Sequence, residues 1–256
     1  MKRIIYICLF FLTIPASYLL SQEQGPGEIE PIPPKRSAPA KLGGGGGFTP
    51  SWLFLNIDPL NQIMRRENLG EFRKGGMFMT GGQGYAYILF VPNLRVGGMG
   101  AGGSMTSKTL SGNTIREVEL SVGFGGVTVD YVVPIVPRLD LTIGALLGGG
   151  SMDLTMTRDY GLAKVWDGTW RDFGSMNPAG EYSEKLSGSF FVLQPSINLE
   201  YAILRWVGFR LGVSYLGMWN GDWKKDDKFD IYGVPSEISG KGFMINSGIF
   251  VGTFIF

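Results

Sequence analysis

From Phe48 onward, apolar and small or polar residues alternate with a period of two over long segments. From Phe191 to Ile203 every odd position is apolar or aromatic, and the segment 207–219 repeats the arrangement with few exceptions. Alternation of this kind is typical of a β-strand with two different faces. The pattern predicts eight strands, at about 48–57, 77–90, 94–109, 115–133, 138–157, 188–203, 206–219 and 242–256.

Two of these segments change phase at glycine. Large apolar residues occupy even positions from Val118 to Phe124 and odd positions from Val127 to Val133, with the change at Gly125-Gly126. A second change falls across 148–150. An extra residue in one strand shifts the alternation by one, so we expect a β-bulge at each place. The alternative is that the strands simply end there.

Short and long connections alternate along the chain. The predicted strands are joined by short turns at 91–93, 134–137 and 204–205, and by long segments at 58–76, 158–187 and 220–241. Residues 110–114 form the shortest connection of the second set. The order predicts an eight-stranded antiparallel up-and-down barrel, with short turns at one end and long loops at the other.

A short helix is predicted inside the first long connection. Asp58-Pro59 is a helix-start pattern, and Leu60, Ile63 and Met64 follow at helical spacing. This helix could plug the mouth of the barrel or, if the barrel spans a membrane, lie in the outer interface of that membrane.

The last predicted strand carries a family resemblance. Phe250, Phe254 and Phe256 share one face, and Phe256 is the last residue of the sequence. The arrangement resembles the terminal aromatic insertion signal of bacterial outer-membrane β-barrel proteins, and 47–256 looks like a barrel of that broad class. The resemblance implies short periplasmic turns, long extracellular loops, and a location in the bacterial outer membrane. It also implies two partners, outer-membrane lipid and the barrel-assembly machinery.

The N-terminal part differs in composition from the rest. Lys2 and Arg3 precede an apolar run that reaches Leu20, which is the order of a secretory signal peptide at 1–21. An uncleaved anchor is the alternative. Residues 22–46 are rich in proline and glycine, which bury little apolar area, so we expect a flexible periplasmic linker.

Composition removes most catalytic chemistry. The chain has no histidine, and its one cysteine is Cys8, which excludes Ser-His and Cys-His catalysis and most zinc sites. A formal net charge of +1 does not suggest nucleic-acid binding. The glycine motif at 98–103 has dinucleotide-site spacing but no helix pattern after it. We therefore expect no catalytic residue, cofactor or metal.

One ion pair is predicted inside the barrel. If the turn near Arg205 joins adjacent strands, Glu200 and Arg210 lie directly opposite each other on the even, inward faces. The alternative is that both charges are solvated at the turn end. Glu117 and Glu119 also share a strand face, and we interpret them as part of a polar lumen wall rather than a cation site.

Aromatic residues gather in the connection 158–187. Trp166, Trp170, Phe173 and Tyr182 offer enough surface to bind a partner, or could pack against one another over the barrel mouth.

Together these patterns predict a non-enzymatic outer-membrane barrel, in which the odd faces of 191–203 and 207–219 face lipid. Eight strands leave an interior just wide enough for side chains, so a structural, small-solute or surface-binding role is expected rather than an open general porin. Two alternatives remain open at this point. One is a soluble, exported, lipocalin-like barrel that binds lipid inside, and the other is a histidine-free lipid-modifying enzyme.

Overall fold

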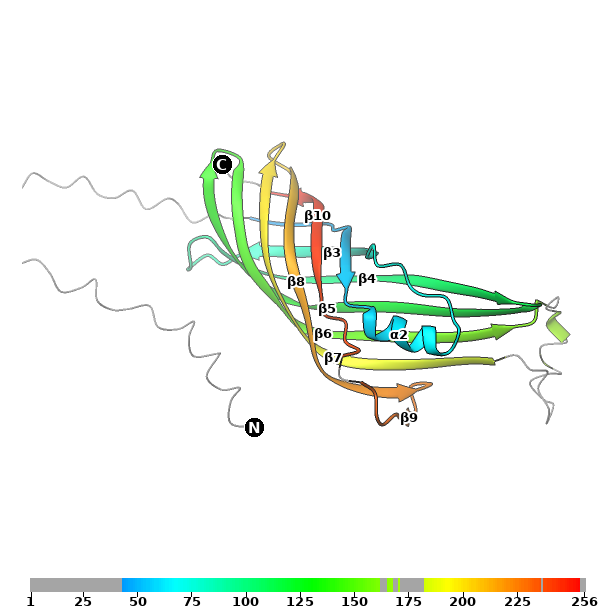
Figure 1. The fold of residues 1–256 in the computed structure, drawn as a ribbon. Helices are drawn as coiled ribbons and strands as arrows, with labels where there is room; N and C mark the ends of the chain where they lie inside the picture. Colours follow the sequence, from blue (N-terminus) through cyan, green and yellow to red (C-terminus); the bar gives the residue numbers. More distant parts are fainter. Residues whose placement is uncertain (1–42, 162–164, 168–169, 171–181, 236, 254–256) are drawn as a thin grey trace, which may run out of the picture. The chain divides into compact units, whose positions relative to one another are not determined.

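The computed structural model describes residues 43–161, 165–167, 170, 182–235 and 237–253 (Figure 1). Among the elements whose bounds lie within these residues are a helix, α2 (Asp58–Arg66), and ten strands. The strands are β1 (Gly44–Phe48), β2 (Ser51–Leu55), β3 (Met77–Tyr87), β4 (Leu94–Ser111), β5 (Thr114–Val136), β6 (Leu139–Asp159), β7 (Tyr182–Ala202), β8 (Val207–Lys225), β9 (Phe229–Asp230) and β10 (Gly242–Gly252). No helix in the described part of the chain is long and apolar enough to cross a membrane.

The strands close into an antiparallel ring with eight positions, which confirms the predicted fold class. β1 and β2 follow each other in one position between β3 and β10, and the ring continues through β4, β5, β6, β7 and β8 back to β10. The short β9 lies outside the ring order and pairs with the far end of β8.

The barrel begins earlier than the composition indicated. The linker was predicted to end at 46, but β1 starts at Gly44 and pairs with both β3 and β10. A Cβ at Gly47 would overlap the carbonyl oxygen of Ile249, so glycine here permits close strand approach instead of flexibility. Residues 1–42, including the predicted signal peptide, lie outside the described residues.

The two predicted bulges at glycine are absent from the structure. β5 and β6 pair without interruption through Gly126 and Gly148, and even residues face inward on both sides of this point. The pairing shifts elsewhere, between Pro134 and Val136, and at 189–191 where β8 carries one extra residue. At these glycines, therefore, even residues continue to face inward. What changes is the kind of residue on each face: the apolar residues move from the inward face to the outward face.

This change divides the barrel into two halves. We call 43–55, 77–100, 126–148, 193–217 and 242–253 the turn half, and the described residues of 56–76, 101–125, 149–192 and 218–241 the loop half. The outward face of the turn half is an apolar belt of large half-exposed side chains, among them Val129, Tyr131, Ile143, Leu147, Ile197, Leu199, Tyr201, Phe209, Leu211, Val213, Tyr215, Phe243, Ile245 and Ile249. Its inward face is mostly polar, with Thr128, Asp130, Thr142, Gln194, Asn198, Ser214 and Asn246 buried.

The loop half has the opposite arrangement. Its inward face is apolar, with Val118, Leu120, Val122, Phe124, Met152, Leu154, Phe190, Val192 and Met218 in one cluster. Its outward face carries residues such as Glu117, Glu119, Ser121 and Asp153. Sequence reasoning took the outer ends of these strands for loops, because charged and small residues dominate one face. β6 instead runs to Asp159, β7 begins at Tyr182, and β8 reaches Lys225.

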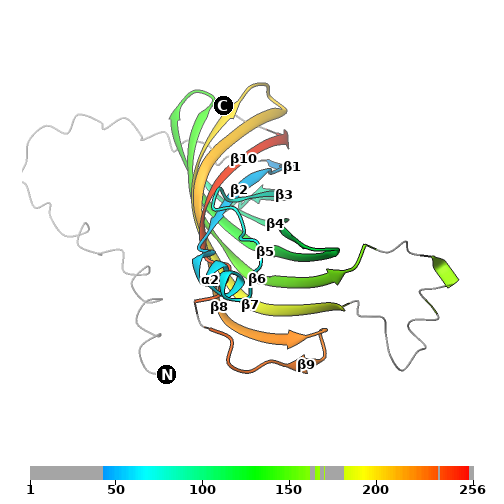
Figure 2. The ribbon, with the colours of Figure 1, turned by 45° about the vertical axis from the view of Figure 1, so that its right-hand side comes forward.

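Strands alone do not enclose the loop half. The β3–β4 ladder ends at Thr80 and Gly102, and the β8–β10 ladder ends at Leu216 and Gly242. Beyond these pairs β4–β8 continue as a curved sheet, visible in Figure 1 as long strands that run past β3 and β10. Figure 2 shows the curvature of these strands from a second direction, with α2 beside them.

The helix helps to cover the apolar face of this sheet. Leu60 and Met64 of α2 are buried in the same cluster as the β5 and β6 side chains, which favours the predicted plug over the membrane interface. The Asn61 amide fixes the segment after the helix, because it donates to the Phe72 carbonyl at 3.1 Å and accepts from the Phe72 amide at 2.9 Å. The helix begins at the predicted Asp58-Pro59 pattern, with Asp58 as its first residue and Ile57 at the N-cap position.

Candidate functional site

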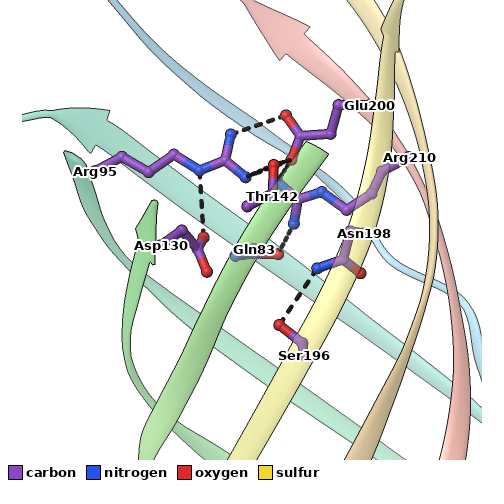
Figure 3. A network of polar contacts seen from close by, with 8 residues as sticks. All are labelled: Gln83, Arg95, Asp130, Thr142, Ser196, Asn198, Glu200 and Arg210. Atoms are coloured by element: carbon purple, nitrogen blue, oxygen red, sulfur yellow. Dashed lines mark hydrogen bonds and ion pairs between the residues drawn. The ribbon is translucent and has the colours of Figure 1, made fainter. Parts of the chain in front are cut away.

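The turn half contains a buried cluster of four charges. Strand register places Glu200 of β7 directly opposite Arg210 of β8, the pairing that the sequence predicts. Arg210 Nη2 lies 2.7 Å from Glu200 Oε1. Arg95, from β4, reaches the same carboxylate from across the barrel and places Nη1 2.8 Å from Oε2 (Figure 3). One carboxylate therefore lies between two guanidinium groups.

Other side chains complete the network. Arg95 Nε donates to Asp130 Oδ2 at 3.3 Å, and the Thr142 hydroxyl donates to Glu200 Oε1 at 3.1 Å. Arg210 Nη1 donates to the Gln83 amide oxygen. The charges of these two arginines and two carboxylates balance, and each has at least one close partner, which lowers the cost of burying them. A third carboxylate, Asp140, lies opposite Glu200 on β6 and lines the same small cavity.

Two aromatic rings cover the guanidinium groups. The Arg95 guanidinium carbon lies 4.1 Å from the centre of the Tyr85 ring, and that of Arg210 lies 4.1 Å from the centre of the Phe250 ring. Such contacts stabilise a desolvated cation. Phe250, predicted as part of an insertion signal, thus lies inside the barrel. Phe254 and Phe256 lie outside the described residues, and the insertion signal itself stays a prediction.

The cluster fills the barrel at this level. Arg95 has no exposed side-chain surface, and Arg210 and Asp130 are buried. The cavity beside the cluster has a volume of about 30 Å³, about the volume of one water molecule. Sequence reasoning found Glu200 and Arg210 but missed Arg95, because its contact with Glu200 spans 105 positions and non-neighbouring strands.

We expected Glu117 and Glu119 to be part of a polar lumen wall, and this expectation is wrong. They point outward from β5 in the loop half, and Glu117 pairs with Lys108 of β4 at 2.9 Å. The expectation failed because it assumed a polar interior along the whole strand. Among the described residues no three His, Cys, Asp or Glu side chains gather as a metal site would require.

The predicted aromatic surface is only partly assembled. The Trp166 and Trp170 rings lie 5.7 Å apart in an edge contact and stay 74% and 60% exposed. Tyr182 belongs to β7, not to a loop, and its ring lies 5.7 Å from Arg158. A hydrogen bond to Glu184 raises the pKa of Tyr182. Phe173 lies outside the described residues.

A larger pocket lies in the loop half, between the end of β8 and the segment 231–241. Its volume is about 760 Å³, within the range of small-molecule sites. Its described lining includes Phe190, Met218, Trp219, Trp223, Ile231, Val234 and Ile238, together with four charged residues. Sequence reasoning missed it because 220–241 was interpreted only as a long connection between two strands. The apolar Ile231, Val234 and Ile238 were the available signal.

No protein-family model matches the chain, and no curated protein matches it. Several solved structures have a similar fold, and the following three are among them. Ail, the attachment invasion locus protein of Yersinia pestis, in complex with sucrose octasulfate, has 10% identity and a TM-score of 0.42 over 83% of this chain and 99% of its own. A major outer membrane protein from Thermus thermophilus has 8% identity and a TM-score of 0.42, over 83% and 100%. The outer membrane protease OmpT from Escherichia coli has 10% identity and a TM-score of 0.34, over 84% and 97%.

Proposed function

We propose that this chain is a non-enzymatic barrel of the bacterial outer membrane that conducts no general solute flow and binds a small ligand at its loop end. The observation that carries the proposal is the buried cluster of Arg95, Asp130, Glu200 and Arg210, which occupies the interior of the turn half. A porin keeps a water-filled channel at this level, whereas the two cavities that border the cluster here have volumes of only about 30 and 20 Å³.

The apolar belt supports a membrane location. Large apolar side chains face outward on β5, β6, β7, β8 and β10, and aromatic residues lie near both edges of the belt. Trp206 and Tyr201 are at the turn edge, and Trp219 and Phe191 are at the loop edge. A barrel embedded in the outer membrane has such a band with an aromatic girdle at each interface. A soluble lipocalin-like barrel would instead present polar residues on this outer face.

The charge cluster also supports a role without catalysis. Both carboxylates contact arginine side chains, and Glu200 is held by two of them. A general acid or base needs a carboxylate that can exchange a proton with a substrate. Neither carboxylate in this cluster faces a cavity large enough for a substrate.

Conductance measurements test the closed lumen. Purified protein in planar lipid bilayers is expected to give no steady single-channel current. A variant that removes the cluster, Arg95→Ala with Asp130→Ala, Glu200→Ala and Arg210→Ala, is expected to gain conductance if it folds, which heat-modifiable gel migration reports. A steady current through the unaltered protein would contradict the proposal.

Spin labels test the membrane location. Since Cys8 is the only cysteine, a Cys8→Ser background carries single labels cleanly. A label at Leu199 of the belt is expected to be relaxed by oxygen dissolved in lipid, and a label at Thr155 on the outward face of the loop half by an aqueous reagent. Aqueous access at both sites would favour a soluble barrel.

A further inference from the structure

The large pocket lies where the wall of the barrel is incomplete. Within the described residues, the β8–β10 ladder stops at Leu216 and β9 pairs with β8 only from Lys224. Between them, 217–222 have no strand partner on the side away from β7, and the segment 231–241 lies across the pocket. The pocket therefore lies at a gap in the strand pairing of the barrel wall.

The inner surface of the pocket is apolar and adaptable. Phe190, Met218, Trp223 and Ile238 are buried and belong to the loop-half cluster. The Phe190 and Trp223 rings meet edge to face at 5.9 Å. Unbranched methionine side chains rearrange readily around an apolar guest. An alkyl chain is the kind of group that this surface would accept.

Two glycines make room for the large side chains of this surface. A Cβ at Gly240 would overlap Met218 Sδ, and a Cβ at Gly221 would overlap the Phe190 ring. Both glycines have ordinary backbone conformations, since neither has a positive φ. Their small size, rather than their backbone freedom, lets the two large side chains take these positions.

The pocket also has charged walls. Asp222, Lys224, Asp230 and Lys241 line it, two of each sign, and none of them forms an ion pair with a described residue. Lys241 Nζ lies 5.6 Å from the centre of the Trp219 ring, which is at the loop edge of the apolar belt. The polar groups thus meet the apolar belt at the level where lipid head groups would lie.

We propose that this pocket binds an amphiphile with a single alkyl chain, without selecting the charge of its head group, and that the amphiphile enters sideways from the outer leaflet past Trp219. The chain lies on the surface formed by Phe190, Met218 and Ile238. The head group stays at the charged wall, where cations and anions are equal in number and neither sign of ligand is favoured. This inference rests on the proposed membrane location, because lateral entry needs the belt to be in lipid.

Binding can be measured with dodecylphosphocholine as the probe. A Cys8→Ser, Ser239→Cys variant carries a polarity-sensitive fluorophore at the pocket and is reconstituted in nanodiscs. Titration below the micellar concentration of the probe is expected to give a saturable shift to a less polar signal. Phosphocholine without a chain is expected to give none. Dodecyl sulfate and dodecyltrimethylammonium are expected to bind with affinities close to that of the zwitterionic probe.

Variants separate the pocket from general partition into the nanodisc. Val234→Trp places a large ring in the pocket and should weaken the saturable response by about tenfold or more, corresponding to about 1.4 kcal/mol. Leu110→Trp, at the exposed end of β4, is the matched control and should leave the response unchanged. An equal response in both variants, or a strong preference for one head-group charge, would overturn the proposal.

The outcome for the membrane location is distinguishable. Incorporation into nanodiscs and heat-modifiable migration are measured before titration. A protein that incorporates but shows no saturable response overturns the pocket proposal alone, whereas a protein that does not incorporate overturns the membrane location.

Discussion

The same five strands form two differently organised regions. In the turn half β4–β8 are part of a closed ring, with polar groups inside and an apolar belt outside. In the loop half they form a curved sheet whose inner face is apolar and is covered by α2 and by connecting segments. The turn half has the arrangement of a membrane barrel, and the loop half has the arrangement of a β-sheet with one face in water.

The difference shows what determines the alternation along a strand. On β5, even residues face inward from Val118 to Val132, so backbone geometry is the same throughout. Only the solvent outside changes, from water beside Glu117 and Glu119 to lipid beside Val129 and Tyr131 under the proposed location. Both faces of the strand change at the same point: the outward residues change from polar to apolar, and the inward residues change from apolar to polar. In the sequence this exchange looks like a shift of the alternation by one residue.

The largest effect is expected at the charge cluster. Glu200→Ala leaves Arg95 and Arg210 buried beside each other without their shared carboxylate, which should destabilise the barrel by about 3–5 kcal/mol. Arg210→Ala should cost less, because Arg95 still pairs with Glu200. Urea unfolding from lipid vesicles measures both. Glu119→Ala, on the outward face of the loop half, is the control and should stay within about 0.5 kcal/mol. Equal losses for Glu200→Ala and Arg210→Ala would contradict the shared-carboxylate geometry.

The next effect compares the two outer faces directly. Leu211→Arg places a charge in the middle of the belt and should cost about 2–4 kcal/mol in a bilayer. Ser121→Arg occupies the corresponding face of β5 in the loop half and should cost no more than about 0.5 kcal/mol. Unfolding free energies in the same vesicles decide the matter. Similar losses of unfolding free energy at both sites would contradict the proposed difference between the outer faces of the two halves.

A smaller effect is expected at the boundary glycines. A Cβ at Gly126 would overlap the carbonyl oxygen of Leu147, whereas a Cβ at Gly98 would lie 3.6 Å from the nearest heavy atom. Gly126→Ala should therefore destabilise by about 1–3 kcal/mol through forced strand displacement. Gly98→Ala should be neutral or slightly stabilising, because alanine loses less conformational entropy on folding. If Gly126→Ala is tolerated as well as Gly98→Ala, the close strand approach at the boundary is wrong.

The smallest effect concerns pH in the loop half. Hydrogen bonds from Lys225 and Tyr182 lower the pKa of the Glu184 carboxyl below its usual 4.5. Such a group stabilises the fold above its unfolded pKa, and the contribution is lost as pH falls through the lower folded value. The difference in unfolding midpoint between the unaltered protein and Glu184→Gln should therefore shrink on acidification below about pH 4.5. A difference that is constant with pH would show that Glu184 acts only through neutral contacts.

Local patterns were enough to predict most of the barrel. Strand number, strand order and the Glu200–Arg210 register follow from alternation and from the length of one turn, which are properties of neighbouring residues. The predicted helix also forms, because Leu60 and Met64 are spaced for one buried face. These features depend on contacts between elements that are adjacent in the sequence.

Features that depend on distant contacts were missed. Arg95 resembles any arginine at a strand start until the ring closes and brings it to Glu200. Gly44–Gly47 resemble a flexible linker until β3 and β10 pair with them from both sides. The pocket required the extra residue in β8, which turns Trp223 inward. No periodicity along one segment contains this information.

The contacts that close the ring, between β10 and the strands β1 and β2, are expected to form late in folding. Closing the ring brings Ser247 against Pro50, 197 positions away in the sequence, whereas β4–β8 pair only with strands that precede or follow them directly, apart from the contact of β8 with β10. Contacts of high sequence separation carry the larger loop-closure entropy and form late in folding. We therefore expect the hairpins that hold the apolar cluster to form first. The glycine strand β1 would then be the last element to join, through backbone hydrogen bonds between its two neighbours.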